Sequence, residues 1–242
     1  IAAGGEKNFG KSTPIGYIGI LENMRIDPDG IKIAGLILAL AIALWTGGTL
    51  FGRLSVQWTA VVVLLFGLFA LSFFRDPERD VPSEKGTVIS AADGVVIDAS
   101  RVPVEEFGPE GAMRIAVFMS VFNVHVNRCP VEGRVIAVRH YPGKKLSAYN
   151  KRAEYENEHG DTDLDTPEGP VRIRQIAGLI ARRVVTRVQE GDELHAGDRI
   201  GLIRFGSRVD VFLPVTYEPA VRPGDHVRAG ETVIARIRTE SR

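Results

Sequence analysis

The sequence predicts a β-dominated α+β domain preceded by an N-terminal transmembrane helical hairpin. Two long apolar stretches near the start of the chain predict the hairpin. Short runs rich in Val and Ile, separated by Gly, Pro and Asp, follow and predict many short strands. A Gly-Asp pattern that occurs twice near the end of the chain indicates two similar β-hairpins.

The first elements are apolar helices over residues 31–50 and 56–74, divided by the short segment FGRLS. Each run is close to the roughly 20 residues that span a bilayer as a helix, which satisfies its own backbone hydrogen bonds in lipid. The alternative is a hairpin buried in a soluble core, which the scarcity of charge disfavours, since only Lys32 lies at an edge. We therefore expect an N-terminal cytoplasmic segment over 1–30, a membrane hairpin over 31–74 and a β-rich domain over 75–242.

Basic residues flank the hairpin and predict its orientation. Arg53 lies in the turn, whereas three basic residues precede the hairpin and three follow it: Lys7, Lys11, Arg25, Arg75, Arg79 and Lys85. The positive-inside rule then places both ends of the hairpin in the cytoplasm. We expect the β-rich domain at the cytoplasmic face of the cell membrane.

The repeated pattern lies in residues 190–203 and 223–236. Gly-Asp and then Ala-Gly occur at matching positions in both segments, and an apolar strand follows each. This arrangement resembles the sandwich-hybrid barrel of biotinyl and lipoyl domains. The tip between the strands has no Lys of the carrier type, so we expect the architecture without a swinging-arm attachment site.

Composition excludes several classes of function. The 242 residues carry 30 basic and 30 acidic side chains, and without a clustered basic face we expect no nucleic-acid partner. Cys129 is the one cysteine, so neither an internal disulfide framework nor a metal site of several thiolates is possible. The histidines show no metal-ligand spacing, and we expect no metal.

Ser207 stands where an apolar residue is expected. Read with period two, it shares a strand face with five apolar residues, Ile203, Phe205, Val209, Val211 and Leu213. A serine there is most often a small core residue with a satisfied hydroxyl. Gly206 before it permits backbone geometry that a residue with a Cβ resists, so that the preceding carbonyl can approach the hydroxyl.

The segment FGSRVDVFLP around this pair resembles the Gly-Ser self-cleavage motif of pyruvoyl-dependent phosphatidylserine decarboxylases, particularly their short form. Other matching segments are FFRDPER, SAADGVV with Asp93, FMSVFNVHVNRCP with His125, and YENE beside Asn157. Their order and spacing agree from about Phe73 to Arg242. The segments are specific together, whereas a lone Gly-Ser pair would carry no weight.

The resemblance implies a self-processing lipid enzyme. The chain would break between Gly206 and Ser207, leaving a β chain (1–206) and an α chain (207–242) whose Ser207 has become a covalent pyruvoyl group. That group would form a Schiff base with phosphatidylserine, which would lose CO2 to give phosphatidylethanolamine. Partners would be the phospholipid, the membrane and the two cleaved chains, and we expect a homodimer.

The resemblance also implies roles for named residues. Ser207 is the nucleophile, His125 moves protons because imidazole titrates near neutrality, and Asp93 assists them as in a hydrolase triad. The ordinary alternatives are a hydrogen-bonded histidine and a turn aspartate that bonds its own backbone. Many bacterial members have a second His three residues after the first, where this chain has Arg128, so His125 is expected to serve both steps or to share them with solvent.

Further residues are candidates for binding the substrate. Arg128 could contact the lipid phosphate, although an Arg at a strand end is more often an ion-pair partner. Asn157 is a second candidate, and a basic loop could hold anionic lipid through Lys144, Lys145, Lys151 and Arg152, unless it is simply a solvated charged loop.

Two functions without catalysis remain open. One is a membrane-anchored sandwich-hybrid adaptor or binding protein, which the lack of sustained heptads disfavours. The other is a lipid-binding structural protein with a decayed active site, for which Arg128 is the one hint.

Overall fold

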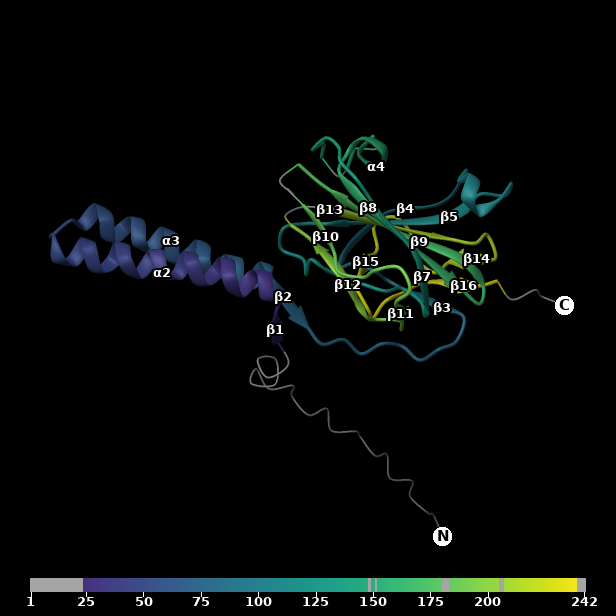
Figure 1. Ribbon diagram of the computed structural model, residues 1–242, viewed down its shortest axis with the longest axis horizontal. Coiled ribbons are helices and arrows are strands. Elements are labelled where there is room, and N and C mark those ends of the chain that lie inside the picture. Colours follow the sequence, from purple (N-terminus) through teal and green to yellow (C-terminus); the bar gives the residue numbers. More distant parts are fainter. Residues whose placement is uncertain (1–23, 148, 151, 180–182, 205–206, 239–242) are drawn as a thin grey trace, which may run out of the picture.

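The computed structural model describes residues 24–147, 149–150, 152–179, 183–204 and 207–238. Two long antiparallel helices, α2 (Pro28–Leu50) and α3 (Leu54–Phe73), project from a β-rich domain (Figure 1). At their base, β1 (Met24–Ile26) pairs with β2 (Arg75–Pro77), so the chain enters and leaves the hairpin side by side. The predicted hairpin is confirmed, and residues 1–23 lie outside the described residues.

Small residues let the two helices approach each other. The buried positions of the hairpin include Ala34, Ala41, Ala60 and Gly67, while large apolar side chains such as Leu36 point outward. A Cβ at Gly67 would lie 2.9 Å from a Leu38 methyl carbon. Only 17% of the most apolar window of each helix is buried, which disfavours a hairpin inside a soluble core and is consistent with association with a membrane.

Ion pairs fix the base of the hairpin to the β domain. Asp27 caps α2 by accepting a hydrogen bond from the Asp29 amide at 3.0 Å, and its carboxylate also binds Arg187 at 2.5 and 2.8 Å. Asp29 binds Arg204 at 3.1 Å. Both arginines come from the far end of the sequence, so these contacts exist only in the folded chain.

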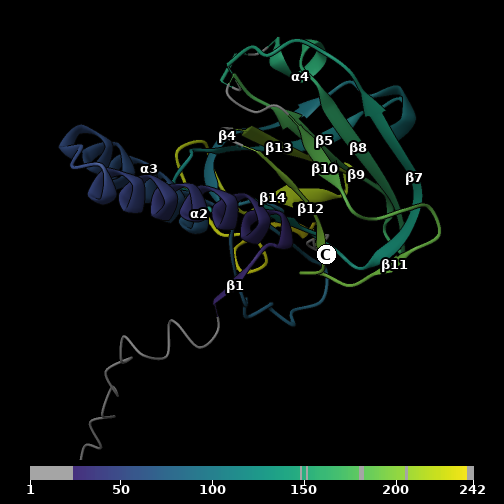
Figure 2. The same ribbon diagram turned by 60° about the vertical axis from the view of Figure 1, so that its left-hand side comes forward.

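In the described residues, the β domain consists of an eight-stranded sheet and two three-stranded sheets, all antiparallel. The eight-stranded sheet has the order β11-β7-β8-β9-β13-β5-β4-β15 and curls into a half-barrel (Figure 2), and the smaller sheets are β10-β12-β6 and β14-β16-β3. The strands are β3 (Thr87–Ile89), β4 (Gly94–Val102), β5 (Ala112–Met119), β6 (Val126–Arg128), β7 (Gly133–Tyr141), β8 (His159–Thr166), β9 (Gly169–Ala177), β10 (Val184–Thr186), β11 (Glu193–Leu194), β12 (Arg199–Ile203), β13 (Ser207–Leu213), β14 (Tyr217–Pro219), β15 (His226–Val227) and β16 (Val233–Ile237). Two short helices, η1 (Glu105–Phe107) and α4 (Ala153–Glu156), interrupt them.

The repeated sequence pattern corresponds to a structural repeat. The first copy contains β11 and β12, and the second contains β15 and β16. In each copy the first strand lies at one edge of the eight-stranded sheet, and the second is the middle strand of a three-stranded sheet. The repeated glycines have positive φ in both copies, 94° and 91° at Gly191 and Gly197 and 101° and 79° at Gly224 and Gly230, a conformation that a side chain disfavours. The β-rich domain is therefore confirmed, while the lipoyl-like architecture stays a prediction.

Strand β13 lies inside the large sheet, paired with β9 on one side and β5 on the other. Its residues Val209, Val211 and Leu213 join the main hydrophobic core, as the period of two predicts. The side chains of Arg208 and Asp210 point to the opposite face. The predicted row is thus confirmed from Ser207 to Leu213. Ile203 instead ends β12 in another sheet, and Phe205 lies outside the described residues.

Candidate active site

Ser207 is completely buried at the start of β13, opposite Met119 of β5 and Ala177 of β9. Its hydroxyl donates to the Met119 sulfur, with 3.3 Å between Oγ and Sδ. A thioether is a weak acceptor, so this contact satisfies the hydroxyl poorly. Gly206, the residue on the other side of the predicted cleavage, lies outside the described residues.

His125 lies just before β6 and is also buried, with 2% of its surface exposed. Its Nδ1 lies 3.0 Å from the carbonyl oxygen of Asn123. Because a carbonyl only accepts, Nδ1 carries the proton and Nε2 keeps its lone pair. Nε2 has no hydrogen-bond partner among the described residues. Burial lowers the pKa of His125 to about 4, the Arg75 charge adds to the shift, and the hydrogen bond to Asn123 opposes it.

The imidazole of His125 also contacts the end of the helical hairpin. Its ring lies 4.1 Å from that of Phe73, the last residue of α3, measured between centroids. The preceding loop is attached to the same place, because Arg75 donates to the Phe122 carbonyl at 2.6 Å.

The fold brings His125 and Ser207 to the same end of the domain. Strand β5 ends at Met119, the partner of Ser207, and the short turn after it leads to His125. The His125 carbonyl accepts from the Ile203 amide at 3.4 Å, where β12 ends just before Ser207. His125 itself lies immediately before β6 and outside any strand.

Asp93 lies in a turn, and other groups hold its carboxylate. Both oxygens accept from Arg79, at 3.0 and 2.9 Å, and Oδ1 also accepts from the Ala229 amide at 2.8 Å. Within the described part of the chain, no hydrogen bond joins Asp93 to His125 or Ser207. Burial lowers the pKa of Arg75, and the charge of Asp93 opposes this shift. Since the charge of Arg75 also lowers the pKa of His125, Arg75 lies within electrostatic range of both residues. The role of Asp93 in self-cleavage stays a prediction.

Arg128 is buried where the chain leaves the hairpin. Its guanidinium donates at 2.9 Å to Asp76 of β2, to the Pro77 carbonyl and to the Gly197 carbonyl. Arg199 binds the same aspartate. These bonds attach the segment after α3 to the β domain, and the phosphate contact stays a prediction.

Replacing Arg128 by Met should destabilise the protein, because Asp76 would lose a buried partner and two carbonyls would lose their donor. We expect a loss of about 3 kcal/mol in the free energy of unfolding, measured by chemical denaturation in mild detergent. Arg134→Met is the control, since Arg134 is exposed and its ion pair with Glu193 is long, at 3.8 Å. Such an exposed pair contributes little to stability. Equal stability of the two variants would contradict the role of this ion pair.

Asn157 supports the strand beside Ser207. Its amide donates to the carbonyls of Leu146 and Ala177, at 2.8 and 2.7 Å, and accepts from the Leu146 amide at 2.8 Å. Since Ala177 pairs with Ser207, these bonds fix one wall of the site. In the basic loop, Lys144 and Arg152 both bind Glu156, and Lys151 lies outside the described residues. Substrate binding by Asn157 and by this loop stays a prediction.

Sequence reasoning missed two polar clusters around Ser207. The first is a row that begins in the core with the buried Met119, Asn127 and Gln175 and ends at the half-buried Thr186. The second lies on the outer face of the sheet, where Arg208 binds Asp210 at 2.6 Å through two bonds and also contacts Glu154 of α4 at 3.3 Å. Burial raises the pKa of Asp210 to about 6, against the attraction of Arg208. In the sequence, the one signal for these clusters was the alternation of charged and apolar residues after Ser207.

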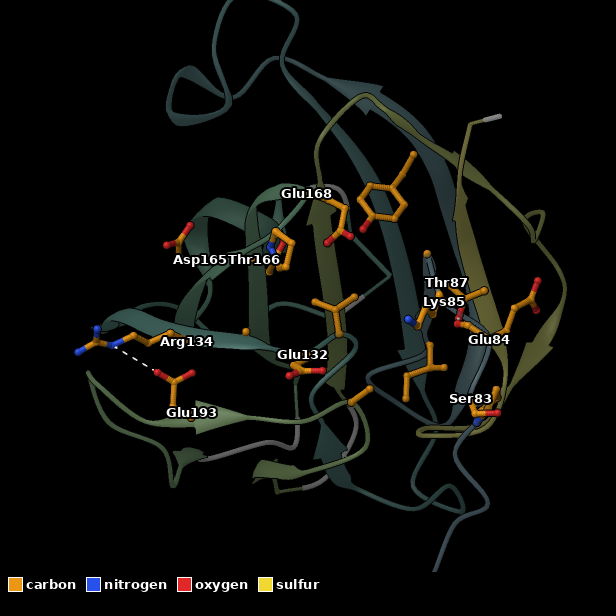
Figure 3. Close-up of a pocket in the computed structure, with 18 residues that line it drawn as sticks. Ser83, Glu84, Lys85, Thr87, Glu132, Arg134, Asp165, Thr166, Glu168 and Glu193 are labelled. Atoms are coloured by element: carbon orange, nitrogen blue, oxygen red, sulfur yellow. Dashed lines mark hydrogen bonds and ion pairs between the residues drawn. The ribbon is translucent and has the colours of Figure 1, made fainter. Parts of the chain in front are cut away.

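A large cavity of about 710 Å³ lies elsewhere in the domain (Figure 3). Ser207, His125 and Asp93 are not among the residues that line it. Its charged lining is mostly acidic, with five carboxylates against two basic side chains: Glu84, Glu132, Asp165, Glu168 and Glu193, with Lys85 and Arg134. This lining would repel an anionic phospholipid head group, so the cavity is a poor candidate for the substrate site.

Known proteins with similar sequences show to which family this chain belongs. The family model described as phosphatidylserine decarboxylase matches residues 66–235. A phosphatidylserine decarboxylase proenzyme of Oleidesulfovibrio alaskensis is 46% identical over 211 residues, covering 87% of this chain and 93% of the relative. The proenzyme of Pelobacter propionicus is 45% identical over 218 residues, covering 89% and 98%. The chain therefore belongs to the phosphatidylserine decarboxylase family.

Proposed function

We propose that this protein is a membrane-associated proenzyme that cuts itself between Gly206 and Ser207 and then decarboxylates phosphatidylserine to phosphatidylethanolamine. Its relatives, named phosphatidylserine decarboxylase proenzymes over most of both chains, support the activity. One observation carries the assignment of the site: a completely buried serine in an apolar row, whose hydroxyl has, among the described residues, only a thioether as acceptor.

Self-cleavage begins with attack of Ser207 Oγ on the carbonyl carbon of Gly206, which exchanges the peptide bond for an ester and frees the amine of Ser207. Removal of the Ser207 Cα proton then breaks the Cβ–Oγ bond, and the electron pair leaves with oxygen as the carboxylate of Gly206. The dehydroalanine that remains tautomerises and takes up water, releasing ammonia and leaving a pyruvoyl group. A serine hydroxyl is a weak nucleophile, so a base must assist the first step.

His125 is the proposed base. At neutral pH its lowered pKa keeps the imidazole uncharged, and Nε2 is free to accept a proton. The described residues thus fit a pyruvoyl group made from Ser207, with a proton acceptor at the same end of the domain. When formed, the pyruvoyl group supplies an electron sink for loss of CO2. His125 could then return a proton to the product carbon, and Asp93 would act through the charge of Arg75.

The same proposal includes the location of the protein, its assembly and its contacts with the substrate. The catalytic domain lies against the cytoplasmic leaflet, with α2 and α3 as its membrane anchor. The enzyme is a homodimer of cleaved β (1–206) and α (207–242) chains, with a lipoyl-like β architecture. Arg128 and Asn157 are the proposed substrate contacts. A catalytically inactive adaptor on the same scaffold is not favoured, because such a protein has no need of a buried serine and a neutral histidine at the same end of the domain.

A mass spectrum of the purified protein tests the proposal. We expect a fragment of residues 207–242 whose N-terminus is a pyruvoyl group, and loss of activity after borohydride reduces the ketone. The blank for nonspecific modification is protein that has no activity and is treated with borohydride in the same way. Mass changes that also occur in this blank do not come from reduction of the ketone. A protein that remains a single chain in its active form would refute both the cleavage and the cofactor.

A further inference from the structure

The sulfur of Met119 accepts two hydrogen bonds in the core of the domain. Ser207 Oγ lies 3.3 Å from Sδ, and Asn127 Nδ2 lies 3.6 Å from the same atom. Ser207, Met119 and Asn127 are all completely buried. A thioether therefore lies between the hydroxyl proposed to cut the chain and a buried amide.

Asn127 is itself held from the other side. Its Oδ1 accepts from Gln175 Nε2 at 2.8 Å, and Gln175 Oε1 accepts from the Thr186 hydroxyl at 3.1 Å. These residues come from β6, β9 and β10, so the row links two of the sheets. Because each amide has fixed partners, the Nδ2 group of Asn127 is directed at the sulfur.

Such a row is costly as packing alone. Buried amides lose their bonds to water, and apolar side chains of the same size would fill the core without that penalty. The row ends at Ser207, the one residue of its strand face that carries a hydroxyl. A directional function at Ser207 explains why polar groups occupy these positions.

We propose that Met119 is a positioning residue for self-cleavage, held by Asn127 and Gln175, and that its sulfur keeps the Ser207 oxygen in one rotamer. This inference rests on the function proposed above. A weak acceptor suits the task, because it orients the hydroxyl without holding its proton strongly. Rotation about the Cβ–Oγ bond then turns the proton toward the base while the oxygen stays in place.

The sulfur of Met119 should matter for self-cleavage and much less for decarboxylation by the matured enzyme. The Ser207 hydroxyl exists only before cleavage, since its oxygen leaves with the carboxylate of Gly206. Loss of the sulfur should therefore slow formation of the pyruvoyl group, and affect decarboxylation by the matured enzyme much less. A role of Met119 in packing alone would not separate the two rates.

Met119→Leu tests this inference, because Leu preserves the volume and removes the acceptor. Without the sulfur, Ser207 can occupy other staggered rotamers, and small misplacements of a nucleophile are expensive. We expect self-cleavage to slow about tenfold, followed on denaturing gels after synthesis of the precursor in a cell-free system with vesicles. Turnover per pyruvoyl group, titrated with a carbonyl reagent, should fall far less.

Met113→Leu is the matched control. Met113 lies on the same strand, is buried, and faces Leu213 instead of Ser207. Its variant should mature at the wild-type rate. Asn127→Leu is the second test, and should slow maturation in the same direction because the sulfur loses its support. Circular dichroism shows whether this variant is folded, and if it is not, the two methionine variants decide.

The outcomes distinguish this inference from the function on which it rests. If wild-type protein is cut at Ser207 and Met119→Leu matures as fast as Met113→Leu, the inference is wrong and the function stands. If Met119→Leu slows maturation and turnover equally, the sulfur matters only for packing. If wild-type protein is never cut, the proposed function fails first.

Discussion

Replacing Ser207 by Ala should abolish both self-cleavage and decarboxylation. The variant keeps the small side chain in the apolar row but has no oxygen to attack the preceding carbonyl, and thus no route to a pyruvoyl group. Ala should be tolerated structurally, because the bond that is lost within the described part of the chain is to the Met119 sulfur, a weak acceptor. Denaturing gels and release of CO2 from carboxyl-labelled phosphatidylserine in vesicles provide the measurement.

Ser90→Ala is the control for this prediction. Ser90 is equally buried, and its hydroxyl donates to the Ala92 carbonyl at 2.7 Å. This variant should lose some stability but remain cut and active. Cleavage of the Ser207→Ala chain at the same bond, or activity of that chain above background, would overturn the assignment of Ser207.

Replacing His125 by Gln should slow self-cleavage by about a thousandfold, within the 10²–10⁴-fold range of general acid–base catalysis. Gln is close in size and can still bond the Asn123 carbonyl, but it cannot take up a proton. The rate of cleavage after synthesis of the precursor is the measurement. His140→Gln is the matched control, because His140 is an exposed residue of β7 beside Glu158.

The pH profile provides a second measurement of His125. With its pKa at about 4, the imidazole is neutral from pH 6 to 8, and the base form is lost only as pH falls toward 4. Titration of His125 should therefore cause no change in the wild-type rate between pH 6 and 8. Wild-type cleavage kinetics in the His125→Gln variant would show that another group is the base.

The apolar helical hairpin and the β-rich character were readable from local sequence. An apolar run long enough to span a bilayer has few stable alternatives to a helix, so residues 31–74 were assigned without tertiary information. Alternation likewise predicted the buried face of β13, from Val209 to Leu213. The order of strands was not readable, because it depends on pairings such as β11 with β7 and β15 with β4 that join distant segments.

The sequence by itself determined the hairpin, the strand-rich domain and the presence of a hydroxyl in an apolar row, because periodicity and hydrophobic length are local properties of the chain. Only the tertiary structure decided what surrounds that hydroxyl. Asp93 binds Arg79, Arg128 binds Asp76, and Ser207 meets the Met119 sulfur. These partners are set by the register of strands and by close packing of the core, so no spacing within one segment could reveal them.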